Sequence, residues 1–407
     1  MLGSLYTGIS GINANSSALS VIGDNIANVN TTAFKGSQAT FANILNRSMQ
    51  GATGDEVGRG VIMSGQRRLW AQGALQNTEN STDLAITGRG FFILDDNGTD
   101  LYTRAGQFHF DKDGQLVNVD NLVVQGWDLR LGSPIGGATD DVIVPPTDYV
   151  AAARTQQFQA DINLDAATAP SDTYSTQFNV WDSLGNEIPL TIQFTKDAVV
   201  PNQWDWSASI PAGAGSVSGG GSGTILFNPD GSLSGAGPDP VIDLTLTNGA
   251  TPAQPLTWNL YSGGATNGSM TQYTASSATS HVAIDGYGAG SLRAININDG
   301  GVLSGTYSNS VILPLFQLAL ADFPSYSGLM PLGRNVYGAS IESGLVSRGP
   351  ANQGALGSIT PQSIELSNID LASEFVNLIK TQRAFQANAR VISSSDEILS
   401  ELINIKR

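Results

Sequence analysis

Both ends of the chain carry apolar residues at alternating three- and four-residue steps, and the long middle has no such pattern. This heptad spacing keeps a narrow apolar stripe on one side of a helix, so that two helices can cover each other's stripe as a coiled coil. We therefore expect the termini to pair or to assemble. The predicted polymerisation interface consists of Leu2, Leu5, Ile9, Ile12, Leu19, Ile26, Leu371, Phe375, Leu378, Phe385, Ala389, Ile392, Leu399 and Ile403.

Polar residues and glycine interrupt both stripes. Ser16 and Gly23 break the first, and Gln382 and Asp396 break the second. Such gaps weaken a helix pair and leave faces that neighbouring copies could cover. The first helix, expected over residues 2–29, is further weakened by glycines that each cost roughly 1 kcal/mol relative to alanine. Helices that simply dock on the globular part are the alternative, but the middle offers them no matching stripe.

Short apolar alternations separated by turn sequences follow from Gly73 onward. The pairs Asn97-Gly98 and Asp113-Gly114 supply the positive φ angles that tight hairpins need. A second β-rich region follows the prolines at 145–146 and contains Trp204 and Trp206 at strand spacing, while its glycine-rich stretch 213–223 is expected to be a flexible loop. The middle of the chain is therefore predicted to be antiparallel β structure.

The expected fold is mainly β with α-helical termini: terminal coiled-coil-like helices plus two nested antiparallel β domains, in an elongated molecule. The predicted parts are a terminal helical assembly domain (1–30 and 368–407), an extended connector (31–72 and 356–367), an inner β domain (73–144 and 286–355) and an outer β domain (145–285).

Composition excludes several classes of function. The net charge of −16, from 19 basic and 35 acidic residues, would repel a nucleic-acid backbone. Cysteine is absent, which excludes disulfides, thiolate metal sites and a cysteine nucleophile. No apolar run approaches the roughly 18 residues of a membrane span. The N-terminus has neither the basic region nor the apolar run of a cleaved secretory signal.

The residues offer no recognisable catalytic constellation. Asp111, Asp113 and Gly114 resemble part of a calcium loop, but further ligand positions are missing and strands flank them. His109 and His281 lie in no nucleophile or metal motif. We therefore predict no catalytic, cofactor-binding or metal site, and no enzymatic activity.

Two long motifs at opposite ends match one family. Residues 22–35 (IGDNIANVNTTAFK) and 367–389 (SNIDLASEFVNLIKTQRAFQANA) resemble the signatures of the axial proteins of the bacterial flagellum, the rod and hook family. Residues 87–93 (TGRGFFI) and 102–108 (YTRAGQF) are similar to that family's first β domain, and residues 181–186 (WDSLGN) to the outer domain of its hook branch. The long middle also favours the hook branch over a rod subunit.

The resemblance implies a subunit of a curved, flexible tube that couples the motor rod to the filament and transmits torque. The implied partners are further copies of the chain in a helical homopolymer, the distal rod protein, the hook cap, the hook-filament junction proteins and the flagellar type III export apparatus. It also implies an extracellular hook attached to the basal body, reached without a cleaved signal peptide. A distal rod subunit and a secreted β-rich adhesin with helical oligomerisation ends are the alternatives.

One further motif follows the first helix. We expect it to bridge helix and β domain and to fix the angle between them; a capped helix end followed by an ordinary loop is the alternative. Its residues are Ala27, Asn28, Asn30, Thr31, Phe34 and Lys35.

Overall fold

The computed structural model describes residues 2–45, 58–130, 135–235, 237–262 and 265–405. By its internal contacts the chain divides into two compact units. Unit 2 consists of residues 147–294 and 306–312, and unit 1 of the remainder. Most of the regular secondary structure is β, with one helix at each terminus, which confirms the predicted fold class.

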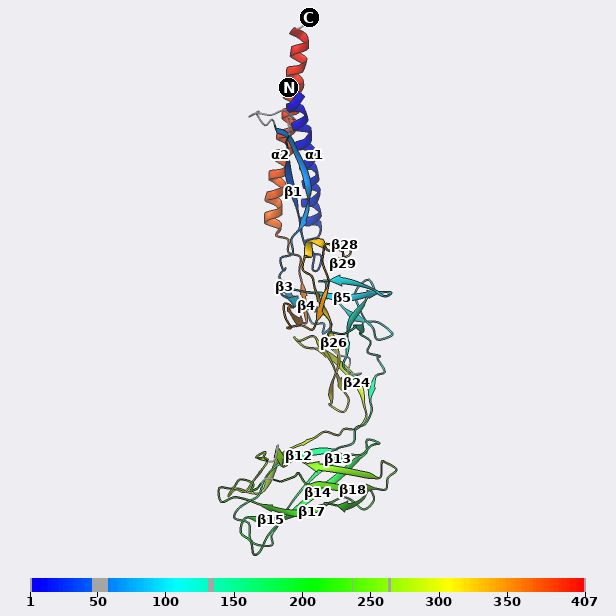
Figure 1. The fold of residues 1–407 in the computed structure, drawn as a ribbon, viewed down its shortest axis with the longest axis vertical. Coiled ribbons are helices and arrows are strands. Elements are labelled where there is room, and N and C mark those ends of the chain that lie inside the picture. The colour runs from blue at the N-terminus through cyan, green and yellow to red at the C-terminus, as the bar shows by residue number, and fades with distance from the viewer. Residues whose placement is uncertain (1, 46–57, 131–134, 236, 263–264, 406–407) are drawn as a thin grey trace. The chain divides into compact units, whose positions relative to one another are not determined.

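The two helices belong to unit 1. They are α1 (Leu2–Ala27) and α2 (Leu371–Ile405), and Figure 1 shows them side by side. Asp370 caps α2, because its carboxylate accepts a hydrogen bond from the Ala372 amide (2.9 Å) and another from the Ser373 hydroxyl (3.1 Å). The Ala372 hydrogen bond is the main cause that lowers the pKa of Asp370.

A long hairpin occupies much of the segment expected to be an extended connector. It consists of β1 (Ser37–Leu45) and β2 (Gly58–Arg68), paired antiparallel, and it lies along α1 (Figure 1). The second expected connector also contains paired strands, β31 (Ser358–Pro361) and β32 (Ser363–Glu365). These strands were missed because the apolar residues of β1 and β2 do not alternate regularly with polar ones, and because β31 and β32 pair with distant segments.

The remainder of unit 1 is a β domain built on β5, which pairs with β6, β9 and β27. Asn97 (φ 52°) and Gly98 (φ 87°) form the predicted turn between β5 and β6. The strands are β3 (Leu75–Asn77), β4 (Leu84–Thr87), β5 (Phe91–Asp96), β6 (Thr99–Thr103), β7 (His109–Phe110), β8 (Leu116–Val117), β9 (Val123–Asp128), β10 (Asp140–Asp141), β27 (Leu320–Asp322), β28 (Met330–Gly333), β29 (Val336–Gly338) and β30 (Ser347–Gly349), with a short 3₁₀ helix at Tyr326–Gly328.

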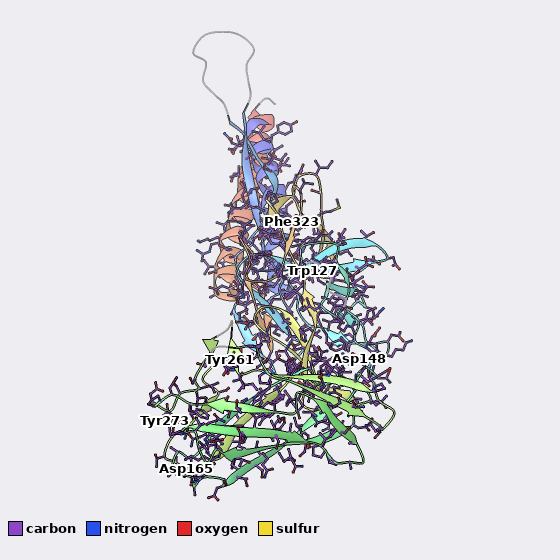
Figure 2. The ribbon with its side chains drawn as sticks, turned by 60° about the horizontal axis from the view of Figure 1, so that its bottom comes forward. Trp127, Asp148, Asp165, Tyr261, Tyr273 and Phe323 are labelled. Carbon is purple, nitrogen blue, oxygen red and sulfur yellow. The ribbon has the colours of Figure 1, made fainter. Side chains whose placement is uncertain are left out.

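Aromatic side chains fill the core of this β domain. Trp127 and Phe323, labelled in Figure 2, are fully buried in the same cluster as Phe91. Trp70 packs edge-on against Phe91, with ring centroids 5.7 Å apart. Because Trp70 follows β2, this contact joins the hairpin segment to the core.

Two large sheets enclose one apolar core in unit 2, and residues 261–262 and 265–266 form a separate two-stranded sheet. One sheet has the order β13-β14-β15-β17, and the other has the order β16-β18-β19-β12-β22, with β23 also paired to β12. The strands are β11 (Tyr149–Val150), β12 (Gln157–Asn163), β13 (Thr173–Trp181), β14 (Glu187–Lys196), β15 (Gln203–Ser209), β16 (Gly215–Gly219), β17 (Ser222–Leu226), β18 (Val241–Leu246), β19 (Ala253–Trp258), β20 (Tyr261–Ser262), β21 (Ala265–Thr266), β22 (Met270–Thr271) and β23 (Ala278–Ile284). The division between the units falls within β24 (Gly290–Ile297), β25 (Val302–Tyr307) and β26 (Ile312–Leu318).

The alternation at Trp204 and Trp206 was a reliable signal, since both side chains are buried in this core. The prediction of a flexible loop over 213–223 was wrong, because β16 and most of that stretch belong to the two sheets. Gly220 has φ +61°, and a Cβ there would lie 1.8 Å from the Val241 carbonyl oxygen. The glycine therefore permits a tight strand approach.

Candidate assembly interface

The contact between α1 and α2 is made by small residues. A Cβ added to Gly8 would lie 2.9 Å from Ile392 Cγ1, and one added to Gly11 would lie 2.6 Å from Asn388 Nδ2. Ala14 and Ala18, further along α1, are each only 4% exposed. Glycine at these two positions therefore lets the helix backbones come close. The described apolar residues of α1 that are buried are Ala14, Ala18, Val21 and Ile22, and none of them belongs to the predicted heptad stripe.

Most of the predicted stripe is incompletely covered within one chain. On α1, Ile9 is 41% exposed, and on α2, Leu371 and Phe375 are 40% and 50% exposed. The partly buried members of the predicted set are Leu5, Ile12, Leu19, Ile26, Leu378, Phe385, Ala389 and Ile392. The side chains of Leu2, Leu399 and Ile403 lie outside the described residues.

Further large apolar side chains are exposed beside this stripe. They lie outside the predicted stripe, because a strict heptad stripe is narrower than the apolar face that a helix can present. On the helices they are Tyr6 (66%), Val376 (50%), Ile379 (50%), Val391 (44%) and Ile398 (51%), and on the hairpin they are Phe41 (50%), Ile44 (37%) and Ile62 (54%). The helix pair with its hairpin therefore keeps a broad uncovered apolar surface.

The hairpin is attached to α1 by polar contacts. The Val61 amide donates a hydrogen bond to Ser10 Oγ (3.2 Å). At the other end, Asn25 Nδ2 donates to the Ser37 carbonyl (2.8 Å) and the Ser37 amide donates to Asn25 Oδ1 (2.9 Å). A groove of about 320 Å³ remains between α1, β1 and α2, with Glu374 in its wall. Burial there raises the pKa of Glu374, although a hydrogen bond from Asn25 opposes the shift.

A buried charged cluster lies where the helices meet the β domain. Lys35 Nζ is 2.5 Å from Glu365 Oε1, and both side chains are almost fully buried. Arg104 Nε lies 3.3 Å from Glu365 Oε2. Lys35 also donates to the Ala71 carbonyl (2.9 Å), and the Gly73 amide donates to Glu365 Oε1 (2.8 Å). These contacts join the segment after α1, the segment before α2 and the β domain.

The backbone around this cluster is also cross-linked. The Ala33 amide donates to the Glu365 carbonyl (2.7 Å), with Ala33 buried at φ +56°. Asn368 Oδ1 accepts from the Gly36 amide (2.9 Å), and Asn368 Nδ2 donates to the Leu69 carbonyl (2.8 Å). We call Lys35, Arg104, Glu365 and Asn368 the connector cluster.

The predicted connector residues have different environments. Lys35 is buried, Phe34 is partly buried, and Ala27 and Asn30 are exposed. Asn28 Nδ2 donates to the Asp24 carbonyl (2.9 Å), and Thr31 Oγ1 donates to Asn28 Oδ1 (3.1 Å). Sequence reasoning missed Glu365 and Asn368, which are more than 250 positions from their partners. A buried lysine requires a partner, but spacing alone could not identify it.

Membrane-spanning helices and metal sites are both absent from the part of the chain that the structure describes. Neither α1 nor α2 has a stretch that is both long and apolar enough to cross a membrane. The described residues also contain no group of three or more histidine, cysteine or carboxylate side chains arranged to hold a metal ion.

Family models match four parts of the chain. They are described as "Flagella basal body rod protein" (residues 5–35), "Flagellar hook protein FlgE/F/G D1 domain" (85–171), "Flagellar basal body protein FlaE D2 domain" (152–287) and "Flagellar basal body rod FlgEFG protein C-terminal" (360–405). The first and last of these matches cover the two terminal signatures.

Full-length relatives are similar throughout. The flagellar hook protein FlgE of Borreliella burgdorferi is 33% identical, over 100% of both chains, and that of Salmonella typhimurium is 33% identical, over 98% of both chains. Among solved structures, the flagellar hook protein FlgE2 of Helicobacter pylori matches with a TM-score of 0.52 at 13% identity, covering 70% of this chain and 98% of that one. This last likeness concerns the fold.

Proposed function

Because the chain belongs to the flagellar hook protein family and is a structural subunit of the hook, we propose that its paired terminal helices carry the contacts between subunits. The rod and adhesin alternatives are not supported, since the full-length relatives are hook proteins. The observation that carries the proposal is the apolar surface that remains exposed after α1, α2 and the hairpin have packed together.

This surface supplies a driving force for polymerisation. Phe375, Val376 and Ile379 occupy neighbouring positions on α2, and each is half exposed. Burial of apolar area contributes roughly 25 cal/mol per Å². Many copies placed around a common axis would cover one another's stripes, and the interface then includes Leu5, Ile9, Ile12 and Phe385 as well as these three residues.

The connector cluster supports different mechanical roles for the terminal helices and for the β domains. We assign residues 1–30 and 368–407 to the assembly domain, and the β domains to the exterior of the tube. Lys35, Glu365 and Arg104 would fix the angle between the helices and the first β domain. Polar contacts between the β domains of neighbouring subunits would then reseat as the tube bends, so that a curved tube transmits torque from rod to filament.

The same proposal covers partners and export. The ends of the polymer would contact the distal rod protein, the hook cap and the hook-filament junction proteins. The subunit would pass unfolded through the flagellar type III export apparatus without a cleaved signal, which is compatible with a chain that has no cysteine to cross-link. We propose a structural role for the protein and no catalytic one.

The test replaces two exposed stripe residues with polar ones. Phe375→Gln and Ile379→Gln together should weaken the free energy of each contact between subunits by about 2 kcal/mol, because less apolar area is buried. This loss would raise the critical concentration for polymerisation roughly thirtyfold. Sedimentation and electron microscopy of the purified full chain would measure it. Val199→Gln with Ile341→Gln is the matched control, since these side chains are 85% and 101% exposed and lie outside the helices.

A truncation gives an independent check. Removal of the residues after Phe385 should leave a folded β protein that forms no tubes. Normal tubes from that truncation, or an unchanged critical concentration for the double glutamine variant, would contradict the proposal.

A further inference from the structure

A cleft in unit 1 gathers arginines beside aromatic rings. It has a volume of about 660 Å³ and is lined by Arg67 and Arg68 at the end of β2, by Trp70, and by Arg89 and Tyr326 of the β domain. Such a grouping is unusual in a chain with only 19 basic residues and a net charge of −16. We call it the arginine cleft.

Two of these arginines carry positive charge that no carboxylate of the described residues neutralises. Arg67 donates only to the amide oxygen of Gln38 (3.3 Å), and Arg68 lies over the ring of Tyr337, 5.2 Å from its centroid. Arg89, by contrast, is paired with Asp322 at 3.0 Å. Arginine binds carboxylates through a planar fork of donors, so the cleft is suited to an acidic segment.

The far end of α2 carries an acidic segment that the fold does not neutralise. Asp396, Glu397 and Glu401 are all exposed. Negative charge is unfavourable at a helix C-terminus, and Glu397 and Glu401 also repel each other at i,i+4 spacing. The last turn of the described helix contains no basic residue. Lys406 and Arg407 follow in the sequence, outside the described residues.

We propose that the arginine cleft of one copy binds the acidic end of α2 from a second copy, a contact that rests on the proposed polymerisation. The two sites cannot meet within one chain. The cleft adjoins the start of α2, because Asn368 donates to the Leu69 carbonyl. Asp396 lies 25 residues beyond Leu371 on the same helix, which is about 37 Å away at 1.5 Å per residue.

This geometry makes the contact head to tail. A heterologous contact of this kind does not close on a dimer, and repeated use extends the assembly into a filament. Successive copies joined in this way would be displaced by roughly 40 Å along the direction of α2. The cleft therefore specifies both a partner surface and an axial step of the polymer.

Cysteine cross-linking tests the contact directly, since the natural chain has no cysteine. Ser327→Cys places a thiol at the cleft and Ser400→Cys places one between the acidic residues, so that every proposed charge remains. Oxidised polymers of the double variant should give a ladder of disulfide-linked multimers on a denaturing gel. Ser216→Cys with Ser400→Cys, which uses an exposed serine of unit 2, should give none.

Charge exchange tests the electrostatic part. Arg67→Glu and Glu397→Arg should each raise the critical concentration about tenfold, and the double exchange should restore it to within about threefold. Lys112→Glu makes the same charge change at an exposed turn and should have little effect. Polymers that form normally but give no ladder and no rescue would overturn this inference and leave the proposed function intact. Failure of the natural chain to polymerise would overturn both.

Discussion

At the scale of single residues, Lys35 is held by a buried ion pair. Its ammonium group lies in a protein interior, where an unpaired charge is very costly, and Glu365 supplies the opposite charge at 2.5 Å. Arg104 approaches the second oxygen of the same carboxylate. The fold of unit 1 therefore depends on three charged residues that come from three separate segments.

Loss of the lysine charge should destabilise unit 1 strongly. Lys35→Met leaves Glu365 buried with only Arg104 and backbone donors, and removal of one partner of a buried pair costs about 3 to 5 kcal/mol. Denaturant unfolding would measure the loss. Arg334→Met breaks the exposed pair with Asp120 and is the control, with an expected cost of about 0 to 1 kcal/mol. Equal effects of the two substitutions would contradict this account of the cluster.

The same lysine should give a pH signature. Burial lowers the pKa of Lys35 from its ordinary 10.5, although the attraction of Glu365 opposes the shift. The folded protein then binds this proton less tightly than the unfolded chain does. The stability of the natural protein relative to Lys35→Met should therefore increase as pH rises from the lowered pKa towards 10.5. A difference that stays constant below pH 10.5 and falls above it would show the opposite shift.

At the scale of elements, the glycines of α1 divide into two kinds. A Cβ added to Gly8 or Gly11 would clash with a side chain of α2, whereas Gly3 and Gly23 have open space beside them. From helix propensity alone, all four glycines would be expected to lower the stability of the helix. The structure shows that two of them permit its packing.

Alanine substitution should separate the two kinds. Gly3→Ala with Gly23→Ala should stabilise α1 by up to about 2 kcal/mol through helix propensity. Gly8→Ala with Gly11→Ala should lose that gain, because Ile392 and Asn388 must move away. Thermal unfolding followed by far-ultraviolet circular dichroism would compare them. If both pairs raised the melting temperature equally, the close approach of α1 and α2 would be excluded.

The elements also show what the sequence could predict. Heptad spacing located both helices, and Asn97-Gly98 located a hairpin turn, because these signals are local. The hairpin of β1 and β2 was missed, because its apolar residues, such as Phe41 and Ile62, do not alternate regularly with polar ones along the strands. The partner of Lys35 was also missed, because a contact over 330 positions leaves no trace in spacing.

At the scale of the whole molecule, unit 2 has a core of its own. Trp204, Trp206 and Trp258 are buried there together with residues of both sheets. The burial of alternate residues along β14 and β18 explains why this region could be read as β structure from the sequence. The division of its strands between two sheets could not be predicted from the sequence, because it depends on contacts between distant segments.

A fragment containing residues 147–312 should therefore fold alone. We expect a cooperative denaturant transition, detected by tryptophan fluorescence, at a midpoint close to that of the corresponding transition in the full chain. A fragment with no cooperative transition would show that unit 2 depends on unit 1 for its stability.

The strands by which the chain first enters and first leaves unit 2 are neighbours. Tyr149 of β11 pairs with Ser291 of β24, and Val150 pairs with Gly290. The 140 or so residues between them thus begin and end at almost the same point, as in domains that tolerate replacement. During evolution, a domain of different size or antigenicity could replace this part, and a fluorescent reporter could be inserted there in the laboratory. Neither change would alter the distance between the two flanking strands.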